Sequence, residues 1–152
     1  MDDAVVRSLA RWPGVPHVYG WLSLDRRGQW RLQGERIGNA ALRDFIGRNY
    51  AADERGCWYF QNGPQRVYVR LDYAPWVVHW EADGLRDQAG HPFAAGEAWL
   101  DDEGSVLLPG RGSVALLDDR DLSRYAEGAE ALPRIGRNEV PARFGFRRDP
   151  AP

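Results

Sequence analysis

The sequence predicts an α+β fold built from two related antiparallel β lobes, each rich in hairpins and carrying a short helix, packed as one compact unit. Three observations lead to this prediction. Short runs of alternating apolar and polar residues are separated by turn signals, a pattern typical of antiparallel strands. Two segments that follow hairpins place apolar residues at helical spacing. An Asp-x-x-Gly motif recurs in both halves of the chain, which indicates an internal repeat.

Composition and charge narrow the class of protein. The chain has 152 residues, of which 43% are hydrophobic, and seven tryptophans, so it is able to bury a core. The net charge of −2 argues against a general nucleic-acid-binding protein. A lone cysteine, Cys57, excludes an internal disulfide. No apolar run reaches the ~18 residues of a membrane span, and the acidic start Met1-Asp2-Asp3 is unlike a secretory signal. We therefore expect a cytoplasmic protein.

The N-terminal element is expected to be a short amphipathic helix over residues 3–12. Val5, Val6, Leu9 and Trp12 recur at helical spacing, and two prolines then end the pattern. We assign residues 1–16 to this helix and its lead-in.

The first β-rich lobe is expected over residues 17–82. Asp25-Arg26-Arg27-Gly28 predicts a hairpin turn, because glycine adopts the left-handed conformation that such turns need. Asn39 is a suitable N-cap for a helix over 40–50. Three consecutive antiparallel strands should follow, joined by turns at Asn62-Gly63 and Ala74-Pro75. Their predicted ranges are Cys57–Gln61, Arg66–Asp72 and Trp76–Glu81.

The second half of the chain predicts a similar arrangement. Residues 83–96 are rich in glycine and polar residues and are expected to connect the lobes. The second lobe is expected over 97–132, with a hairpin around Asp101–Gly104, a strand at Ser113–Leu117 and a helix at 119–126. Residues 133–152 form a basic C-terminal extension, which should be partly docked because it includes apolar residues.

The internal repeat is carried by the turn and the strand that follows it. Asp25-x-x-Gly28-x-Trp30-x-Leu32-x-Gly34 recurs as Asp101-x-x-Gly104-x-Val106-x-Leu108-x-Gly110, and a weaker copy begins at Asp53. Aspartate and glycine are ordinary turn residues, so similar turns can also arise independently. The shared order of strand, turn, strand and helix favours duplication. A seam between two such lobes would be a common location for a ligand.

The first half of the chain resembles a bacterial family named domain of unknown function 1285. The resemblance covers roughly Trp21 to Val78 and includes an acidic-turn hairpin, a leucine-rich helix and an Ala-Pro-aromatic step. It implies an α+β fold with duplicated motifs and a small-molecule, nucleotide-like site at the interface of the lobes, but no particular activity. The residues that carry it are Asp25, Gly28, Trp30, Gly34, Ile37, Leu42, Phe45, Gly56, Trp58, Ala74, Pro75 and Trp76.

Sequence motifs for known catalytic or metal sites are missing. The three histidines are far apart in sequence and the cysteine stands alone, so we expect no metal and no cofactor. There is no glycine-rich phosphate loop and no Gly-x-Ser-x-Gly nucleophile motif. Carboxylate pairs lie at predicted caps and turns, where a structural role is usual. The sequence therefore favours a non-enzymatic protein.

The best candidate site lies on the central hairpin. Strand alternation places Arg66, Tyr68 and Arg70 on one face, with Gln61, Asn62 and Gln65 at the adjoining turn. Two arginines beside a tyrosine are suited to bind an anion and stack a planar ring. The alternative is an ordinary solvated strand face.

We therefore predict a ligand-binding or regulatory domain that recognises a small anionic, nucleotide-like molecule, without metal, membrane or nucleic acid. The alternative is a protein-interaction module that uses an exposed sheet edge or an aromatic patch, with a protein as its partner.

Overall fold

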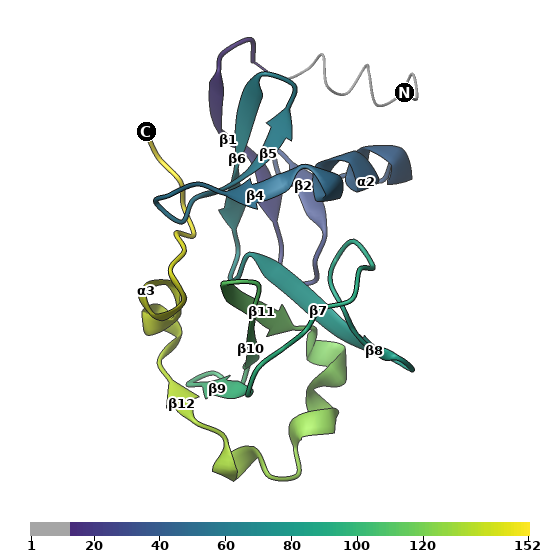
Figure 1. Ribbon diagram of the computed structural model, residues 1–152, viewed down its shortest axis with the longest axis vertical. Helices are drawn as coiled ribbons and strands as arrows, with labels where there is room; N and C mark the ends of the chain where they lie inside the picture. The colour runs from purple at the N-terminus through teal and green to yellow at the C-terminus, as the bar shows by residue number, and fades with distance from the viewer. Residues whose placement is uncertain (1–12) are drawn as a thin grey trace. The chain divides into compact units, whose positions relative to one another are not determined.

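The computed structural model describes residues 13–152, and Figure 1 shows its strands and short helices. The helix predicted over residues 3–12 lies outside the described residues. The described chain divides into two compact units. The first comprises residues 13–25, 29–72 and 147–152, and the second comprises residues 26–28 and 73–146.

The first unit is a six-stranded mixed sheet with one helix among its described residues. Its elements are β1 (His17–Leu24), β2 (Trp30–Leu32), β3 (Glu35–Arg36), α2 (Ala40–Arg48), β4 (Tyr50–Ala52), β5 (Trp58–Asn62) and β6 (Gln65–Leu71). The strand order is β3-β2-β1-β6-β5-β4. The central pair, β1 and β6, is parallel, and every other neighbouring pair in this order is antiparallel. Figure 1 shows β1, β6 and β5 side by side.

Local sequence explains the elements of the first unit. Val67, Val69 and Leu71 of β6 are buried, as strand alternation requires. Helix α2 begins at the predicted cap, where the Asn39 side chain accepts a hydrogen bond from the Leu42 amide. The helix buries Leu42 together with Ile46, four residues later on the same face. The sheet and the helix therefore follow the predicted alternation and capping.

The second unit contains a second six-stranded mixed sheet in the described chain. Its strands are β7 (Trp76–Glu81), β8 (Gly84–Arg86), β9 (Trp99–Asp101), β10 (Val106–Gly110), β11 (Ser113–Leu117) and β12 (Arg134–Ile135). They are arranged in the order β12-β9-β10-β11-β7-β8. Parallel pairing joins β11 to β7 and β12 to β9, while the remaining neighbours are antiparallel. A cluster of buried side chains that includes Val78, Phe93, Val106, Leu108 and Leu117 forms the core of this unit.

The predicted α+β class and the two β lobes are confirmed, but the pairing of the central strands differs from the prediction. β6 pairs with β5, whereas β7 lies in the other sheet, so the predicted three-stranded meander ends after two strands. The physical reason is that β6 already has β1 on its other edge and offers no edge to β7. Tyr73, Ala74 and Pro75 form a bent link without regular structure, and the predicted Ala74-Pro75 turn does not close a hairpin because β6 and β7 lie in different sheets.

The predicted lobe boundaries differ from the observed units for the same reason. The first unit stops at Asp72, while the prediction extended it to residue 82. β7 belongs to the second unit because it hydrogen-bonds to β8 and β11. Part of the predicted connection over 83–96 is therefore a strand, since β8 lies within it.

The C-terminal third contains short helices and a docked segment. The predicted helix over 119–126 is a 3₁₀ helix, η1 (Asp119–Tyr125), which the Asp118 side chain caps. Two further 3₁₀ helices are η2 (Ala129–Ala131) and η3 (Arg137–Glu139). Helix α3 (Val140–Phe144) starts with proline near its N-terminus and ends at Gly145, whose φ is 72°. Val140 and Phe146 are buried, so this extension is a packed part of the protein.

Candidate binding cavity in the first unit

Within residues 13–152, four Asp-x-x-Gly turns share one hydrogen-bond pattern. In each turn the aspartate amide donates to the carbonyl four residues later, and the side-chain Oδ1 accepts from the amide of that same residue. The glycines have φ between 78° and 85°, where a side chain would be strained. The sequence repeat identified three of these turns. The fourth lies in the predicted connection, because no matching strand motif follows it. The four aspartates are Asp25, Asp53, Asp87 and Asp101.

Asp53 is the aspartate that supports the candidate site. Its side chain is only 3% exposed and accepts hydrogen bonds from the amides of Arg55 (2.9 Å) and Cys57 (3.0 Å). Its other oxygen, Oδ2, accepts from the Tyr68 hydroxyl at 3.2 Å and lies 3.5 Å from Arg55 Nε. Burial alone would raise the pKa of Asp53, but these donors and the Arg55 charge outweigh burial and hold its pKa below the ordinary value. Asp53 is therefore a fixed anion that orients Arg55 and Tyr68.

Three tyrosines and a histidine form an aromatic cluster around Tyr68. The rings of Tyr19 and Tyr68 stack in parallel, with centroids 4.7 Å apart. His17 and Tyr59 each contact Tyr68 edge-on, with ring centroids 5.8 Å away. Tyr68 is buried, while Tyr19 is half-buried and His17 is exposed. The cluster brings β1, β5 and β6 together and leaves two rings accessible to a ligand.

Arg66 lies at the edge of this cluster. Its guanidinium lies 4.3 Å from the centroid of the Tyr59 ring. A hydrogen bond with the Tyr68 side chain is the main cause that raises the pKa of Arg66. Since Tyr68 donates its proton to Asp53, its oxygen is the acceptor for Arg66. Within residues 13–152 no carboxylate forms an ion pair with Arg66. Asp53 attracts Arg66 through its charge without forming an ion pair, so the guanidinium keeps donors for a ligand.

Arg55 is the second arginine of the site. A hydrogen bond with the Tyr19 side chain is the main cause that raises the pKa of Arg55. The guanidinium also donates from Nη1 to the Ala151 carbonyl at 3.0 Å. Arg55 thus links the acidic turn, the aromatic cluster and the C-terminal segment.

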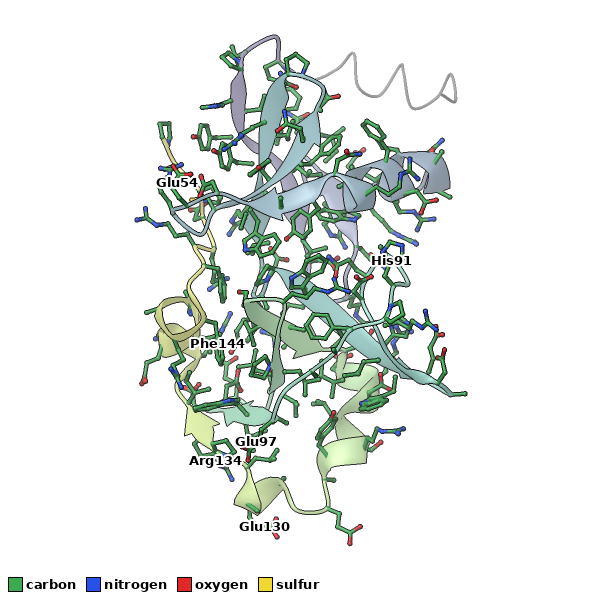
Figure 2. All side chains as sticks on the ribbon, in the orientation of Figure 1. Glu54, His91, Glu97, Glu130, Arg134 and Phe144 are labelled. Carbon is green, nitrogen blue, oxygen red and sulfur yellow. The ribbon has the colours of Figure 1, made fainter. Side chains whose placement is uncertain are left out.

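These side chains surround an open cavity of about 650 Å³. Every residue that lines it belongs to the first unit. Glu54, labelled in Figure 2, belongs to the Asp53 turn and is one of the lining residues. The cavity combines cations with aromatic rings, the groups that recognise anionic and planar parts of a ligand. The lining residues are Pro16, His17, Tyr19, Asp53, Glu54, Arg55, Arg66, Tyr68 and Pro152.

The structure separates the six residues that the sequence predicted for the site. Arg66 and Tyr68 line the cavity, while Arg70 is exposed and lies outside the lining, beside Ser23 of β1. The three amide side chains make structural hydrogen bonds. Gln61 donates to the Gly63 and Gln65 carbonyls, Asn62 donates to the Gln65 side chain, and Gln65 donates to the Pro13 and Val15 carbonyls. These amides hold the hairpin and the chain that precedes β1.

His17, Tyr19 and Arg55 were missing from the predicted site. His17 and Tyr19 reach it because β1 pairs with β6 in parallel, a pairing between strands more than forty residues apart that no local pattern indicates. Arg55 lies in the acidic turn, which was interpreted as structural alone. The Asp-x-Arg-Gly spacing was the available signal, since it places an arginine beside the turn carboxylate.

Two further findings concern metals and membranes. Among residues 13–152, no group of three or more His, Cys, Asp and Glu side chains is placed to hold a metal ion. No helix in this part of the chain has the length and apolar character needed to span a membrane.

Comparison with models of protein families assigns the chain to a family. A family model described as "Protein of unknown function (DUF2946)" matches residues 1–151. The chain belongs to this family. No curated protein matches the sequence.

Two crystal structures of other proteins are similar to this family member. A DUF1285 family protein from Shewanella baltica shares 17% sequence identity with a TM-score of 0.53, over 70% of this chain and 90% of that one. A DUF1285 family protein from Silicibacter pomeroyi shares 18% identity with a TM-score of 0.54, over 84% of this chain and 85% of that one. These matches confirm the predicted resemblance at the level of the fold and extend it beyond the first half of the chain.

Proposed function

We propose that the first unit binds a small molecule with an anionic group in the cavity between β1, β6 and the Asp53 turn. The observation that carries this proposal is the state of Arg66, whose guanidinium is held against Tyr59 and Tyr68 and has no carboxylate partner within residues 13–152. Arginine presents several donors in a rigid plane that matches carboxylates and phosphates. A preformed cation of this kind binds an anion with little loss of conformational freedom.

The aromatic rings favour a ligand with a flat part as well as a charge. Tyr19 stacks on the buried Tyr68 and keeps part of its surface accessible, and His17 is exposed next to it. Planar rings of a ligand stack on such side chains, with Arg55 near enough to add a second cation. A nucleotide, with its base and phosphates, has both features.

The other residues predicted for the site support ligand binding indirectly. Arg70 shares a strand face with Arg66 and adds positive potential without contact. Gln61, Asn62 and Gln65 hold the hairpin that carries Arg66, through the hydrogen bonds given above.

The proposal is for binding and not for catalysis. Asp53 is a candidate base by position, but its two oxygens accept two amide hydrogen bonds and a tyrosine hydroxyl, so its carboxylate is held as a charge. A general base needs a pKa near the working pH, whereas the pKa of Asp53 is lowered. A ligand-binding or regulatory role fits these residues better.

Titration calorimetry and thermal shift with pyrophosphate, nucleoside monophosphates and acidic metabolites test the proposal. A ligand at about 100 times its Kd should stabilise the protein by about 2.7 kcal/mol. Arg66→Ala should abolish binding of the best ligand. The matched control is Arg70→Ala on the same strand face, which should retain binding within a few-fold. Absence of any response across the panel, or equal loss in both variants, would overturn the assignment of the cavity.

The alternative of a protein-interaction surface has no comparable support. Within the described chain, Val15 is the single large hydrophobic side chain in the exposed class, at 48%. An aromatic or apolar docking patch needs several such side chains together.

A further inference from the structure

The chain returns to the first unit after completing the second. Arg147 donates its amide to the Gly56 carbonyl at 2.9 Å, and the Leu71 amide donates to the Arg148 carbonyl at 2.8 Å. The Arg148 side chain also donates to the carbonyls of Leu71 and Asp72. These bonds attach residues 147 and 148 to the turn before β5 and to the end of β6. Figure 1 shows this segment in yellow, beyond α3.

The next residues, Asp149-Pro150-Ala151-Pro152, lie at the candidate cavity with far fewer bonds. Arg55 Nη1 donates to the Ala151 carbonyl, and Pro152 is one of the lining residues. This hydrogen bond is exposed to solvent. Its two prolines lack an amide donor, and the segment forms neither a helix nor a strand. The contact at the cavity is therefore weak compared with the attachment at residues 147–148.

From this difference we infer that residues 149–152 form a displaceable occupant that regulates access to the cavity, an inference that rests on the proposed function. The segment uses Arg55, the guanidinium that a bound anion would share with Arg66. Pro152 lines the same cavity as His17, Tyr19 and Tyr68. A ligand that engages both arginines displaces the segment, while the attachment at residues 147–148 keeps the segment nearby.

The expected size of the effect follows from the contact. One solvent-exposed hydrogen bond and one proline contact give a modest preference for the occupied state. Apparent affinity falls in proportion to the fraction of molecules that are open. Releasing the segment should therefore tighten ligand binding by about 2- to 10-fold.

The test compares the full chain with the double variant Pro150→Gly and Pro152→Gly, which loosens the segment without removing it. A chain that lacks residues 150–152 provides a second release variant, and Pro133→Gly in the second unit is the matched control. Two quantities are measured: the ring signals of His17 and Tyr19 by NMR without ligand, and the Kd for pyrophosphate. We expect both release variants to shift the ring signals and to lower the Kd by about 2- to 10-fold, with the control unchanged.

The outcomes separate this inference from the proposed function. Ring signals that do not move in either release variant contradict the occupation of the cavity. An equal Kd in all proteins overturns the regulation and leaves the binding function standing. If pyrophosphate and the nucleotide panel bind to none of the proteins, both the proposed function and the regulation are refuted.

Discussion

The Asp53 turn of the first unit and the Asp101 turn of the second have the same backbone, yet their surroundings differ. Both aspartates accept hydrogen bonds from the amides two and four residues later. Each aspartate is followed three residues later by a glycine with φ near 80°. Both also accept a tyrosine hydroxyl on the second carboxylate oxygen, from Tyr68 in one case and Tyr73 in the other. The two tyrosines are not equivalent in the repeat, since Tyr68 lies 15 residues after Asp53 and Tyr73 lies 28 residues before Asp101.

The difference is in the tyrosine–aspartate hydrogen bond and in the groups around it. The Tyr73 hydroxyl lies 2.6 Å from Asp101 in a buried environment, and burial together with the Asp101 charge raises the pKa of Tyr73 well above its ordinary value. The Tyr68 hydroxyl lies 3.2 Å from Asp53, and this pair is flanked by Arg55 and the cavity. Both pairs border an open pocket, but the one lined by Asp101 is smaller, about 390 Å³, whereas Asp53 lies at the cavity that also holds Arg66 and the aromatic rings. The turn itself has a structural role. The groups around Oδ2 of its aspartate determine whether it supports a binding site.

The largest expected effect comes from removing the two carboxylates. Asp101→Ala leaves the buried Tyr73 hydroxyl and the partly buried Glu103 and Ser105 amides without their acceptor, and should lower the free energy of unfolding by about 3–5 kcal/mol. Asp53→Ala should cost about 1–3 kcal/mol, because none of its three hydrogen bonds is fully buried. Urea unfolding measures both. Equal losses would show that the two environments are energetically alike.

Removing only the hydroxyls should give a smaller effect in the same direction. Tyr73→Phe leaves Asp101 Oδ2 without its donor and should cost about 2 kcal/mol. Tyr68→Phe should cost about 1 kcal/mol or less, since Arg55 lies 3.5 Å from the same Asp53 oxygen. A double variant that combines Tyr68→Phe with Asp53→Ala tests whether the effect of Tyr68→Phe comes from this hydrogen bond. If it does, the double variant should lose less free energy of unfolding than the sum of the two single losses.

Changes to the turn backbone should affect the two regions alike. Gly56 and Gly104 have φ values of 79° and 85°, and alanine at either position costs about 1–2 kcal/mol through backbone strain. Asparagine tolerates this conformation better and should recover part of the loss at Gly104, where an added Cβ would meet no other atom within 4 Å. Chemical denaturation of the four variants is the measurement. A loss at one glycine only would contradict the equivalence of the turns.

The smallest expected effect is a dependence on pH. Because the folded state lowers the pKa of Asp53 from 3.8, the unfolded state binds the proton more tightly and stability falls as the pH decreases. The contribution is present above pH 4 and is lost as the pH falls through the folded-state pKa. Asp53→Asn should therefore differ from the unchanged protein most at neutral pH, and the difference should shrink toward pH 2. Melting temperatures across this range test the sign. A difference that grows in acid would be inconsistent with a stabilised carboxylate.

Local patterns in the sequence were sufficient to predict most elements of the fold. Asn39 caps α2 as expected, and the Asn62-Gly63 turn joins β5 to β6. Such features depend on neighbouring residues, so they are visible without the rest of the chain. The place of β7 depends on which strand edges are free, and the parallel partner of β6 comes from residue 17 onward. Alternation alone contains no information on such pairings.

The candidate site was predictable only in part for the same reason. Arg66 and Tyr68 share a strand face, which strand alternation gives directly. Tyr19 and Arg55 reach the cavity through the β1–β6 pairing and the Asp53 turn. Pro152 is separated in sequence from the other lining residues by residues 73–146, and no spacing rule anticipates its place at the cavity.

The return of residues 147–152 to the first unit also has a consequence for synthesis on the ribosome. The Gly56 carbonyl and the Leu71 amide obtain partners from Arg147 and Arg148, which are translated only after residues 73–146. Closing a contact across such a long stretch of chain is slow relative to local folding. We therefore expect the Gly56 carbonyl and the Leu71 amide to form hydrogen bonds with water while the second unit is being synthesised. These two hydrogen bonds then form only when residues 147 and 148 have emerged.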